Sequence, residues 1–260
     1  MTILDKLADH AKERCEAYKR SMTLQELINI VSSFPKGEGA FENALRKPGL
    51  SFICECKKAS PSKGMIAENF PYIQIAKEYE EAGADCISVL TEPKWFLGSD
   101  RYLEEISKAV SIPCLRKDFT VDEYMIYQAR ILGASAVLLI CAILSESQLK
   151  EYIALSDHLG LSALVEAHDE KEVNTALKCG AHIIGVNNRD LRDFSVDTGN
   201  SRRLREQIPS DIIFVSESGI KNADDTAALK KAGVDAVLIG EALMKAENKK
   251  QKLAELRGHL

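Results

Sequence analysis

Short apolar runs alternate with amphipathic segments along most of the chain. In five places a glycine ends the amphipathic segment, and two residues separate it from the next apolar run. These glycines are Gly83, Gly133, Gly160, Gly180 and Gly233, and the runs that follow them span 86–90, 136–140, 163–165, 183–184 and 236–239. A glycine just past a helix supplies the left-handed C-cap that a side chain would penalise. The pattern therefore predicts helices that turn directly into strands.

Three further apolar runs fit the same spacing without a glycine, at 51–58, 112–119 and 212–218. The segments predicted as helices between strands are 73–81, 102–109, 122–132, 146–159, 170–178, 200–207 and 223–231. Helices that alternate with continuously apolar strands are typical of a parallel sheet covered on both faces. Eight such units favour a closed barrel over an open doubly wound sheet, which would also need a Gly-x-Gly-x-x-Gly loop that this sequence lacks. We predict an α/β fold, a (β/α)8 TIM barrel with an N-terminal helical extension.

Residues 1–48 precede the first predicted strand and contain further helical patterns. Apolar positions from Ile3 to Tyr18 recur at helical spacing with acidic residues between them, which argues against a transit or secretory peptide. Thr23 and Glu26 form a capping-box pattern that begins a second helix, and a helical turn follows near 41–45. We expect this extension to cover one mouth of the barrel. The sequence has no Pro/Gly/Ser-rich linker, so we predict one domain over 1–260, with the barrel at 49–260.

Composition and charge narrow the class of protein. Of the 260 residues, 45% are hydrophobic and 28% are charged, an ordinary globular balance. The net charge of −5 argues against a general nucleic-acid or anionic-membrane binder, and no apolar run approaches the length of a membrane span. The seven cysteines show neither Cys-x-x-Cys pairs nor zinc-ligand spacing. We expect a cytoplasmic protein without a metal or another cofactor.

Ionisable and amide side chains gather where the predicted strands end. They are Glu55 and Lys57, Lys117, Glu166, Asn187 and Arg189, and Glu217. Buried charges cost several kcal/mol unless they are paired or functional, and the C-terminal rim of a barrel carries its active site. A structural ion pair is the alternative for Glu55 and Lys57, and Glu166 alone could reach solvent. Arg116 alternates with Lys117 and is expected to point outward with a structural role. The pattern favours an acid–base site with two lysines and two or three carboxylates.

The loops after the last two predicted strands have the composition of an anion site. They contain Ser218 and Gly219 in one loop, and Gly240 and Glu241 in the other. Small residues let backbone N–H groups close on an anion, and a short helix beginning there adds its positive end. These two loops form the usual phosphate site of this fold. Ordinary turn glycines are the alternative, but the pair in this position predicts a phosphorylated small-molecule substrate.

Five motifs carry a resemblance to a known family. They are 55–64 (ECKKASPSKG), 115–119 (LRKDF), 164–166 (LVE), 185–191 (GVNNRDL) and 216–220 (SESGI). Together, and over essentially the whole chain, these motifs resemble the indole-3-glycerol-phosphate synthases of tryptophan biosynthesis. The resemblance implies a lyase that closes the indole ring of 1-(2-carboxyphenylamino)-1-deoxyribulose 5-phosphate, with loss of carbon dioxide and water. It also implies other tryptophan-pathway enzymes as possible partners.

The resemblance implies a role for each matching residue. Lys117 is expected to be the general acid on the ketone oxygen. Glu55, Lys57 and Glu166 share the remaining proton transfers, in a division that stays open. Asn187 is expected to orient the substrate and Glu217 to hold the lysines. The predicted substrate contacts are Ser60, Lys57 and Arg189 to polar groups, and Phe96, Phe119, Leu138 and Leu191 to the aromatic ring, with core packing as the alternative for the apolar side chains.

The sequence departs from the family pattern at a residue of the predicted phosphate site, and two other functions are alternatives to the one that the resemblance implies. Glu241 stands where relatives often have serine, so its side chain is expected to turn outward while its backbone N–H binds phosphate. An enzyme like phosphoribosylanthranilate isomerase is the nearest rival, and Cys54 or Cys56 would be its candidate base. A catalytically inactive barrel that acts as a scaffold is the other. The intact charges at the strand ends argue against both.

Overall fold

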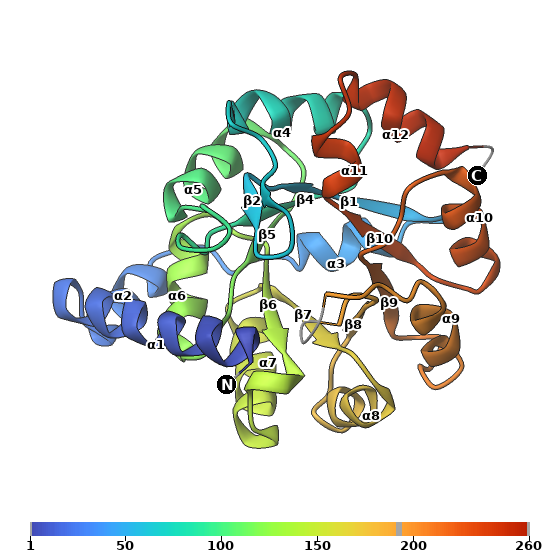
Figure 1. Ribbon diagram of the computed structural model, residues 1–260. Helices are drawn as coiled ribbons and strands as arrows, with labels where there is room; N and C mark the ends of the chain where they lie inside the picture. Colours follow the sequence, from blue (N-terminus) through green and yellow to red (C-terminus); the bar gives the residue numbers. More distant parts are fainter. Residues whose placement is uncertain (1, 191–193, 259–260) are drawn as a thin grey trace.

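The computed structural model describes residues 2–190 and 194–258. Within them, eight parallel strands close into a barrel in chain order, and the last strand pairs with the first (Figure 1). The strands are β1 (Ser51–Cys56), β4 (Cys86–Leu90), β5 (Cys114–Lys117), β6 (Ala136–Ile140), β7 (Ser162–Ala167), β8 (Ile183–Asn187), β9 (Ile213–Glu217) and β10 (Ala236–Ile239). The predicted TIM barrel is confirmed.

Helices surround the barrel on the outside, as the alternation of elements predicts (Figure 1). They are α4 (Tyr72–Glu81), α5 (Asp100–Ala109), α6 (Glu123–Ile131), α7 (Glu146–His158), α8 (Glu170–Lys178), α9 (Gly199–Arg205) and α10 (Ala223–Lys231). The predicted C-cap glycines have the expected conformation, with φ of +83° at Gly133 and +86° at Gly180. Each chain reversal therefore costs little strain and delivers the next strand directly to the barrel.

Two apolar layers fill the space on the two sides of the strands. One layer lies between the strands and the helices, and includes Phe52, Val137 and Phe214. The other fills the inside of the barrel, with side chains such as Ile53 and Leu115. Successive side chains of a strand point to opposite faces, so both faces are buried and each strand is apolar almost throughout.

The structure contains several elements that the sequence pattern did not predict. They are a two-stranded hairpin of β2 (Ala59–Ser60) and β3 (Gly64–Met65), the 3-10 turn η1 (Cys141–Ile143) and the helix α12 (Lys249–Arg257). The short helix that was expected after the last strand is present as α11 (Glu241–Met244). The hairpin follows β1 at the C-terminal rim, and α11 follows β10 there. Three of the predicted strands are shorter than expected. The run 112–119, for example, is a strand only over Cys114–Lys117.

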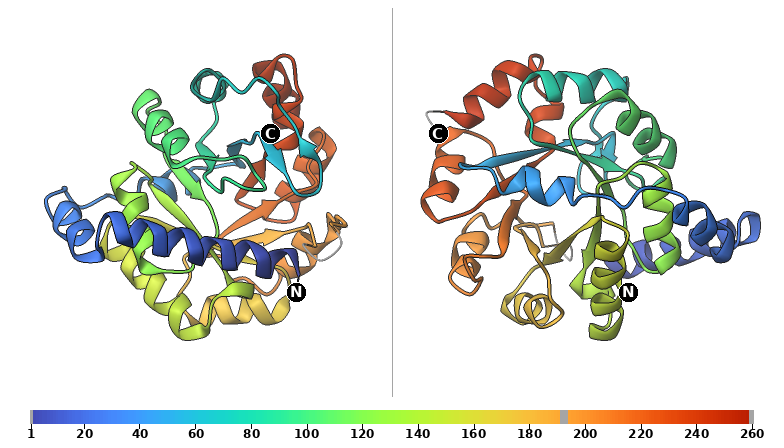
Figure 2. Two further views of the ribbon diagram at one scale, coloured as in Figure 1. Left: turned by 60° about the vertical axis from the view of Figure 1, so that its left-hand side comes forward. Right: turned by 180° about the vertical axis from the view of Figure 1, so that it is seen from behind.

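The N-terminal extension forms α1 (Ile3–Ser21), α2 (Leu24–Ser32) and α3 (Ala40–Leu45). The predicted capping box is present, because Thr23 and Glu26 bond each other's backbone N–H groups. In Figure 2, α1 lies across the barrel in the left view, and α3 lies over the opposite end in the right view. Leu7 of α1 and Phe41 of α3 both join the apolar cluster inside the barrel. The extension therefore packs at both ends, where one mouth was expected.

Buried ion pairs attach α1 to the strand ends. The guanidinium of Arg14 donates two hydrogen bonds, of 2.6 and 3.1 Å, to the carboxylate of Asp118 directly after β5. Arg116 points out of the barrel as predicted, and its Nη2 lies 2.8 Å from Asp100 Oδ1 at the start of α5. Tyr18 of α1 donates to the other oxygen of Asp100. The two neighbours of Lys117 are thus fixed from outside the barrel.

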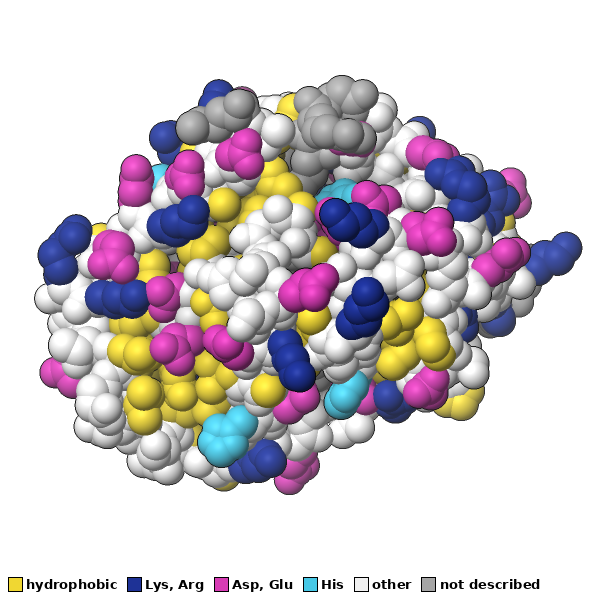
Figure 3. All heavy atoms as spheres, turned by 90° about the horizontal axis from the view of Figure 1, so that it is seen from below, with side chains coloured by type: hydrophobic (Ala, Val, Ile, Leu, Met, Phe, Trp, Pro, Cys, Tyr) yellow, Lys and Arg dark blue, Asp and Glu magenta, His cyan; other side chains and the backbone are white. Residues whose placement is uncertain are grey.

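Acidic and basic side chains are interspersed over the face seen in Figure 3. Within residues 2–190 and 194–258, no helix is both long and apolar enough to cross a membrane. The seven cysteines all lie in these ranges as free thiols, and six of them are buried. Burial raises the pKa of the Cys56 thiol well above its usual range, so this side chain packs as a small apolar group.

Candidate active site

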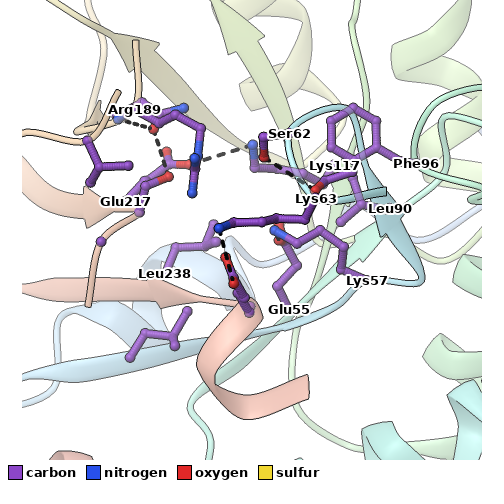
Figure 4. Close-up of a pocket in the computed structure, with 18 of the residues that line it drawn as sticks. Glu55, Lys57, Ser62, Lys63, Leu90, Phe96, Lys117, Arg189, Glu217 and Leu238 are labelled. Carbon is purple, nitrogen blue, oxygen red and sulfur yellow. Dashed lines mark hydrogen bonds and ion pairs between the residues drawn. The ribbon is translucent and has the colours of Figure 1, made fainter. Parts of the chain in front are cut away.

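A cavity of about 650 Å³ opens at the C-terminal ends of the strands. It is lined by Glu55, Lys57, Ser60, Phe96, Lys117, Phe119, Leu138, Glu166, Asn187, Arg189, Glu217, Ser218, Gly219, Gly240 and Glu241. Every site residue predicted from the sequence is among them except Leu191, which lies outside the described residues. The structure thus gathers side chains from all eight strands of the barrel and from the following loops around one space (Figure 4).

Strand alternation decides which residues of β5 reach this cavity. Leu115 belongs to the inner apolar cluster, and Lys117, two residues later, points to the same side. The side chain of Lys117 is only 15% exposed. Its ammonium nitrogen lies 3.4 Å from Glu166 Oε2 and 3.6 Å from Glu217 Oε2. The lysine therefore faces the carboxylates of two other strands.

The surrounding carboxylates set the protonation of Lys117. Burial by itself disfavours the ammonium, but the charges of Glu217, Glu166 and Glu55 outweigh it and raise the pKa of Lys117 above its usual range. The side chain is therefore a charged proton donor at neutral pH. A protonated amine in a partly dry site can both stabilise a developing oxyanion and transfer a proton to it.

Glu217 lies in a different environment from the other carboxylates. Burial, and then the charges of Glu166 and Glu55, raise its pKa to about 7 against the opposing attraction of Lys117. Gly185 on the neighbouring strand makes room for this side chain, because an added Cβ there would collide with Glu217 Oε1. That oxygen is buried and has no hydrogen-bond partner among the described residues. Glu217 is therefore poised between its acid and its carboxylate forms.

Glu55 and Lys57 form an ion pair on β1 and the residue just after it. Lys57 Nζ lies 2.6 Å from Glu55 Oε1, and Ser88 Oγ donates to Glu55 Oε2 at 3.2 Å. Burial would raise the pKa of Glu55, but the charges of Lys57 and Lys117 hold it below its usual value. The ion pair considered as the structural alternative is therefore present, and it lines the cavity (Figure 4).

Gly240, at the end of β10, lies against this ion pair. A Cβ on this residue would be 2.6 Å from Glu55 Oε1 and 3.0 Å from Lys57 Nζ. Glu241 follows, and its carboxylate contacts Lys245 at 2.6 Å and Lys63 at 3.9 Å at the rim. The Glu241 carboxylate is thus paired with two lysines that line the cavity, as Glu241 itself does, and its expected outward orientation stays a prediction.

The loop after β9 has an unusual backbone that suits an anion. Ser218 and Gly219 have consecutive positive φ angles of +69° and +85°. A left-handed conformation at a serine costs about 1–2 kcal/mol, and such strain gathers at functional sites. The Asn187 side-chain oxygen accepts from Ser218 Oγ at 2.9 Å and from the backbone N–H of Arg189 at 3.0 Å. Asn187 therefore holds together the loops after β8 and β9.

Aromatic and aliphatic side chains line the other part of the cavity. The rings of Phe96 and Phe119 lie 6.1 Å apart and are tilted by 39°. The loop that carries Phe96 is held by the buried Glu92, whose carboxylate accepts the backbone N–H groups of residues 94, 95 and 96. Leu138 lines the cavity and also belongs to the inner core. Both interpretations of this leucine, substrate contact and core packing, are thus compatible with its position.

Several residues near the site were not predicted. Lys63 and Lys245 reach the rim, and Ile3 and Leu7 of α1 add apolar surface. His168 lies directly behind Glu166, with Nε2 3.4 Å from Glu166 Oε1. A signal for His168 was available, because it follows Glu166 by two residues and so continues on the same face of the strand. The position of α1 had no local sequence signal of this kind.

Comparisons with solved structures agree with the fold. Two solved structures have the same fold at low identity, 3-hexulose-6-phosphate synthase and thiamine phosphate pyrophosphorylase from Pyrococcus furiosus. The first has a TM-score of 0.65 at 18% identity and covers 80% of this chain and 98% of its own. The second has a TM-score of 0.60 at 20% identity and covers 83% of this chain and 95% of its own. At these identities the likeness supports the fold alone.

Sequence relatives are much closer. The indole-3-glycerol phosphate synthase of Ruminiclostridium cellulolyticum is 58% identical, over 98% of this chain and 99% of the relative. The protein of that name from Endomicrobium trichonymphae is 54% identical, over the same shares of the two chains. The family model described as indole-3-glycerol phosphate synthase matches residues 4–256. The chain therefore belongs to the indole-3-glycerol phosphate synthase family.

Proposed function

We propose that Lys117 is the general acid of the family reaction and that Glu166, Glu55 and Lys57 complete its proton transfers. The chain is a carbon–carbon lyase of tryptophan biosynthesis, and its reaction closes the indole ring of 1-(2-carboxyphenylamino)-1-deoxyribulose 5-phosphate. The observation that carries the proposal is the inward ammonium of Lys117, 3.4 Å from Glu166 and 3.6 Å from Glu217.

The two ends of the substrate match the two ends of the cavity. Its phosphate fits the turns at Ser218–Gly219 and Gly240, where backbone N–H groups and the nearby Arg189 can bind an anion. Its aromatic ring fits between Phe96 and Phe119. In this orientation the ketone lies between the two ends, within reach of Lys117. With the Asn187 oxygen already occupied, its amide nitrogen can donate to the substrate.

The proposed reaction begins with ring closure and ends with the loss of water. The ring carbon that bears the carboxylate attacks the ketone carbon, and the ketone oxygen takes a proton from Lys117 to become a hydroxyl. Loss of carbon dioxide returns the electron pair to the ring. The hydroxyl then leaves with a proton as water, and the CH2 carbon beside the nitrogen loses a proton to give the indole, whose nitrogen keeps its hydrogen. Glu166 and Lys57 are the candidates for the proton given to the hydroxyl, and Glu55 is the candidate for the final base.

The rival functions fit the cavity less well. A cysteine base would have to face the substrate, but Cys54 and Cys56 belong to the layer between the strands and the helices. A scaffold without activity does not account for buried charges held at contact distance around an open cavity. We further propose a cytoplasmic location, which suits seven free thiols, and other tryptophan-pathway enzymes as partners.

The activity assay tests these roles directly. The purified enzyme is given the anthranilate-derived ribulose phosphate, and indole fluorescence is followed. We expect Lys117→Ala to lower kcat by about 10²- to 10⁴-fold, the usual contribution of a general acid, with the fold retained. Lys230→Ala, an exposed lysine on α10, is the matched control. A Lys117→Ala enzyme with a near-normal rate would remove Lys117 from this role.

A further inference from the structure

His168 lies between two carboxylates just beyond the end of β7. Its Nε2 is 3.4 Å from Glu166 Oε1 inside the barrel mouth, and its Nδ1 is 3.1 Å from Glu172 Oε2 in the first turn of α8. The backbone N–H of His168 donates to the same oxygen of Glu172 at 2.8 Å. Glu172 therefore fixes the imidazole from behind and directs Nε2 toward Glu166.

The contacts of His168 favour its charged form. Burial opposes a charge on the ring, but the hydrogen bond with Glu172 and the charges of Glu166, Glu172 and Glu217 raise the pKa of His168 to about 9. The other polar neighbours come from adjacent elements. Asn200 in α9 donates to the carbonyl of residue 168. The two carboxylate residues have further partners, because Lys117 on β5 donates to Glu166 and Cys141 in η1 donates to the backbone carbonyl of Glu172.

The two oxygens of Glu166 thus have different partners. Oε2 accepts from Lys117 Nζ at 3.4 Å, and Oε1 faces His168. His168 Nε2 is buried and has no hydrogen bond among the described residues. The ring does not line the cavity, whereas Glu166 does. The Nε2 group is thus a buried donor without a hydrogen bond to any described residue, and it is directed at the carboxylate of Glu166. This arrangement indicates that the contact between His168 and Glu166 shortens when Glu166 changes its charge or position.

We propose that His168 is a positioning residue for Glu166. His168 is itself fixed by Glu172. It keeps one carboxylate oxygen of Glu166 directed toward Lys117 and supplies a charged N–H donor to the other carboxylate oxygen. The inference rests on the proposed role of Glu166 in proton transfer. An imidazolium at this position stabilises the negative charge of Glu166 and also lowers the pKa of Glu217. It therefore balances part of the charge of the carboxylates around Lys117 from outside the substrate cavity.

Two substitutions separate the donor from the charge. His168→Asn is too short to reach Glu166 but can keep the contact with Glu172, so we expect kcat to fall by about 10- to 100-fold through misplacement of Glu166, with KM little changed. His168→Gln can place a neutral amide donor near the position of Nε2, so kcat at neutral pH should largely recover. His158→Asn, an exposed histidine at the end of α7, is the matched control and should leave the rate unchanged.

The pH profile distinguishes positioning from a purely structural role. Loss of the imidazolium disfavours the ionised carboxylates, so the acidic limb of the kcat profile should move to higher pH in both His168 variants. A loss of fold would lower the active fraction without moving that limb. An unchanged kcat in His168→Asn, or an unmoved acidic limb in both variants, overturns the inference.

Glu166→Gln separates this inference from the proposed function. If Glu166→Gln retains its activity, the proton-transfer role of Glu166 fails, and the inference fails with it. If Glu166→Gln is inactive while both His168 variants behave as the wild type, only the inference about His168 fails. If Glu166→Gln is inactive and the His168 variants show the expected loss and shift, both are supported.

Discussion

The protonation of Glu217 gives a quantitative prediction about stability. Its pKa is about 7 in the folded protein, because of burial and the charges of Glu166 and Glu55, and an ordinary glutamate has a pKa of about 4.3. At a pH between these two pKa values, Glu217 keeps its proton in the folded state but has lost it in the unfolded state. The free energy of unfolding therefore falls as the pH rises through this range. The side chain is only 2% exposed, so solvent does not screen these interactions appreciably.

The size of the effect follows from the two pKa values. At a pH well above 7, holding Glu217 in the fold costs about 3–4 kcal/mol relative to a glutamate with an ordinary pKa. Between pH 5 and pH 8 the change is about 2–3 kcal/mol. Glu217→Gln keeps the shape of the side chain and removes its titration. We therefore expect this variant to gain about 2–3 kcal/mol of stability relative to the wild type between pH 5 and pH 8.

Urea unfolding at several pH values, followed by circular dichroism, measures this difference. The dependence of the unfolding free energy on urea should stay the same, so that the shift in midpoint reports stability alone. Glu206→Gln replaces an exposed glutamate at the end of α9 and should show no such dependence on pH. Parallel stability curves for the wild type and Glu217→Gln would refute the reasoning, because Glu217 would then ionise equally in both states.

Two more substitutions test the packing around the site. Gly240→Ala places a Cβ 2.6 Å from Glu55 Oε1 and 3.0 Å from Lys57 Nζ, so we expect kcat to fall by at least about tenfold as the pair is displaced. The steady-state rate at saturating substrate checks this, and an unchanged rate would contradict it. Arg14→Met leaves the buried Asp118 without its main partner, so we expect a loss of about 3–5 kcal/mol in urea unfolding at neutral pH. A loss below 1 kcal/mol would show that Asp118 is satisfied without α1.

The barrel could be predicted because its strands have both faces buried. The ranges 86–90, 136–140 and 236–239 match the observed strands at both ends, since continuous apolar runs bounded by a C-cap glycine leave little choice. Helix α12 was missed because its apolar pattern is weak, with only Leu253 and Leu256 buried among polar residues. The β2–β3 hairpin consists of strands of two residues, too short for any periodicity to show.

Strand alternation predicts which side chains of each strand face the site. Alternation places Lys117 inward and Arg116 outward, and it brings Glu55 and Lys57 to one face. It does not say which side chains from distant strands touch. The contact between Lys117 and Glu166 joins residues 49 positions apart, and the one between Arg14 and Asp118 joins residues 104 positions apart. Such contacts depend on how the closed barrel brings strands and helices together, which the local pattern does not contain.

The end of β5 explains how the N-terminal extension can matter to a reaction that it does not perform. As the proposed general acid, Lys117 needs a fixed position, since a misplacement of about 1 Å can cost about 100-fold in rate. On either side of it, Arg116 and Asp118 are held by ion pairs to α5 and α1. Because the three residues are consecutive, a backbone held at both neighbours cannot shift the ammonium without breaking a buried ion pair. Helix α1 thus stabilises the fold and the geometry of the proposed general acid through the same contact.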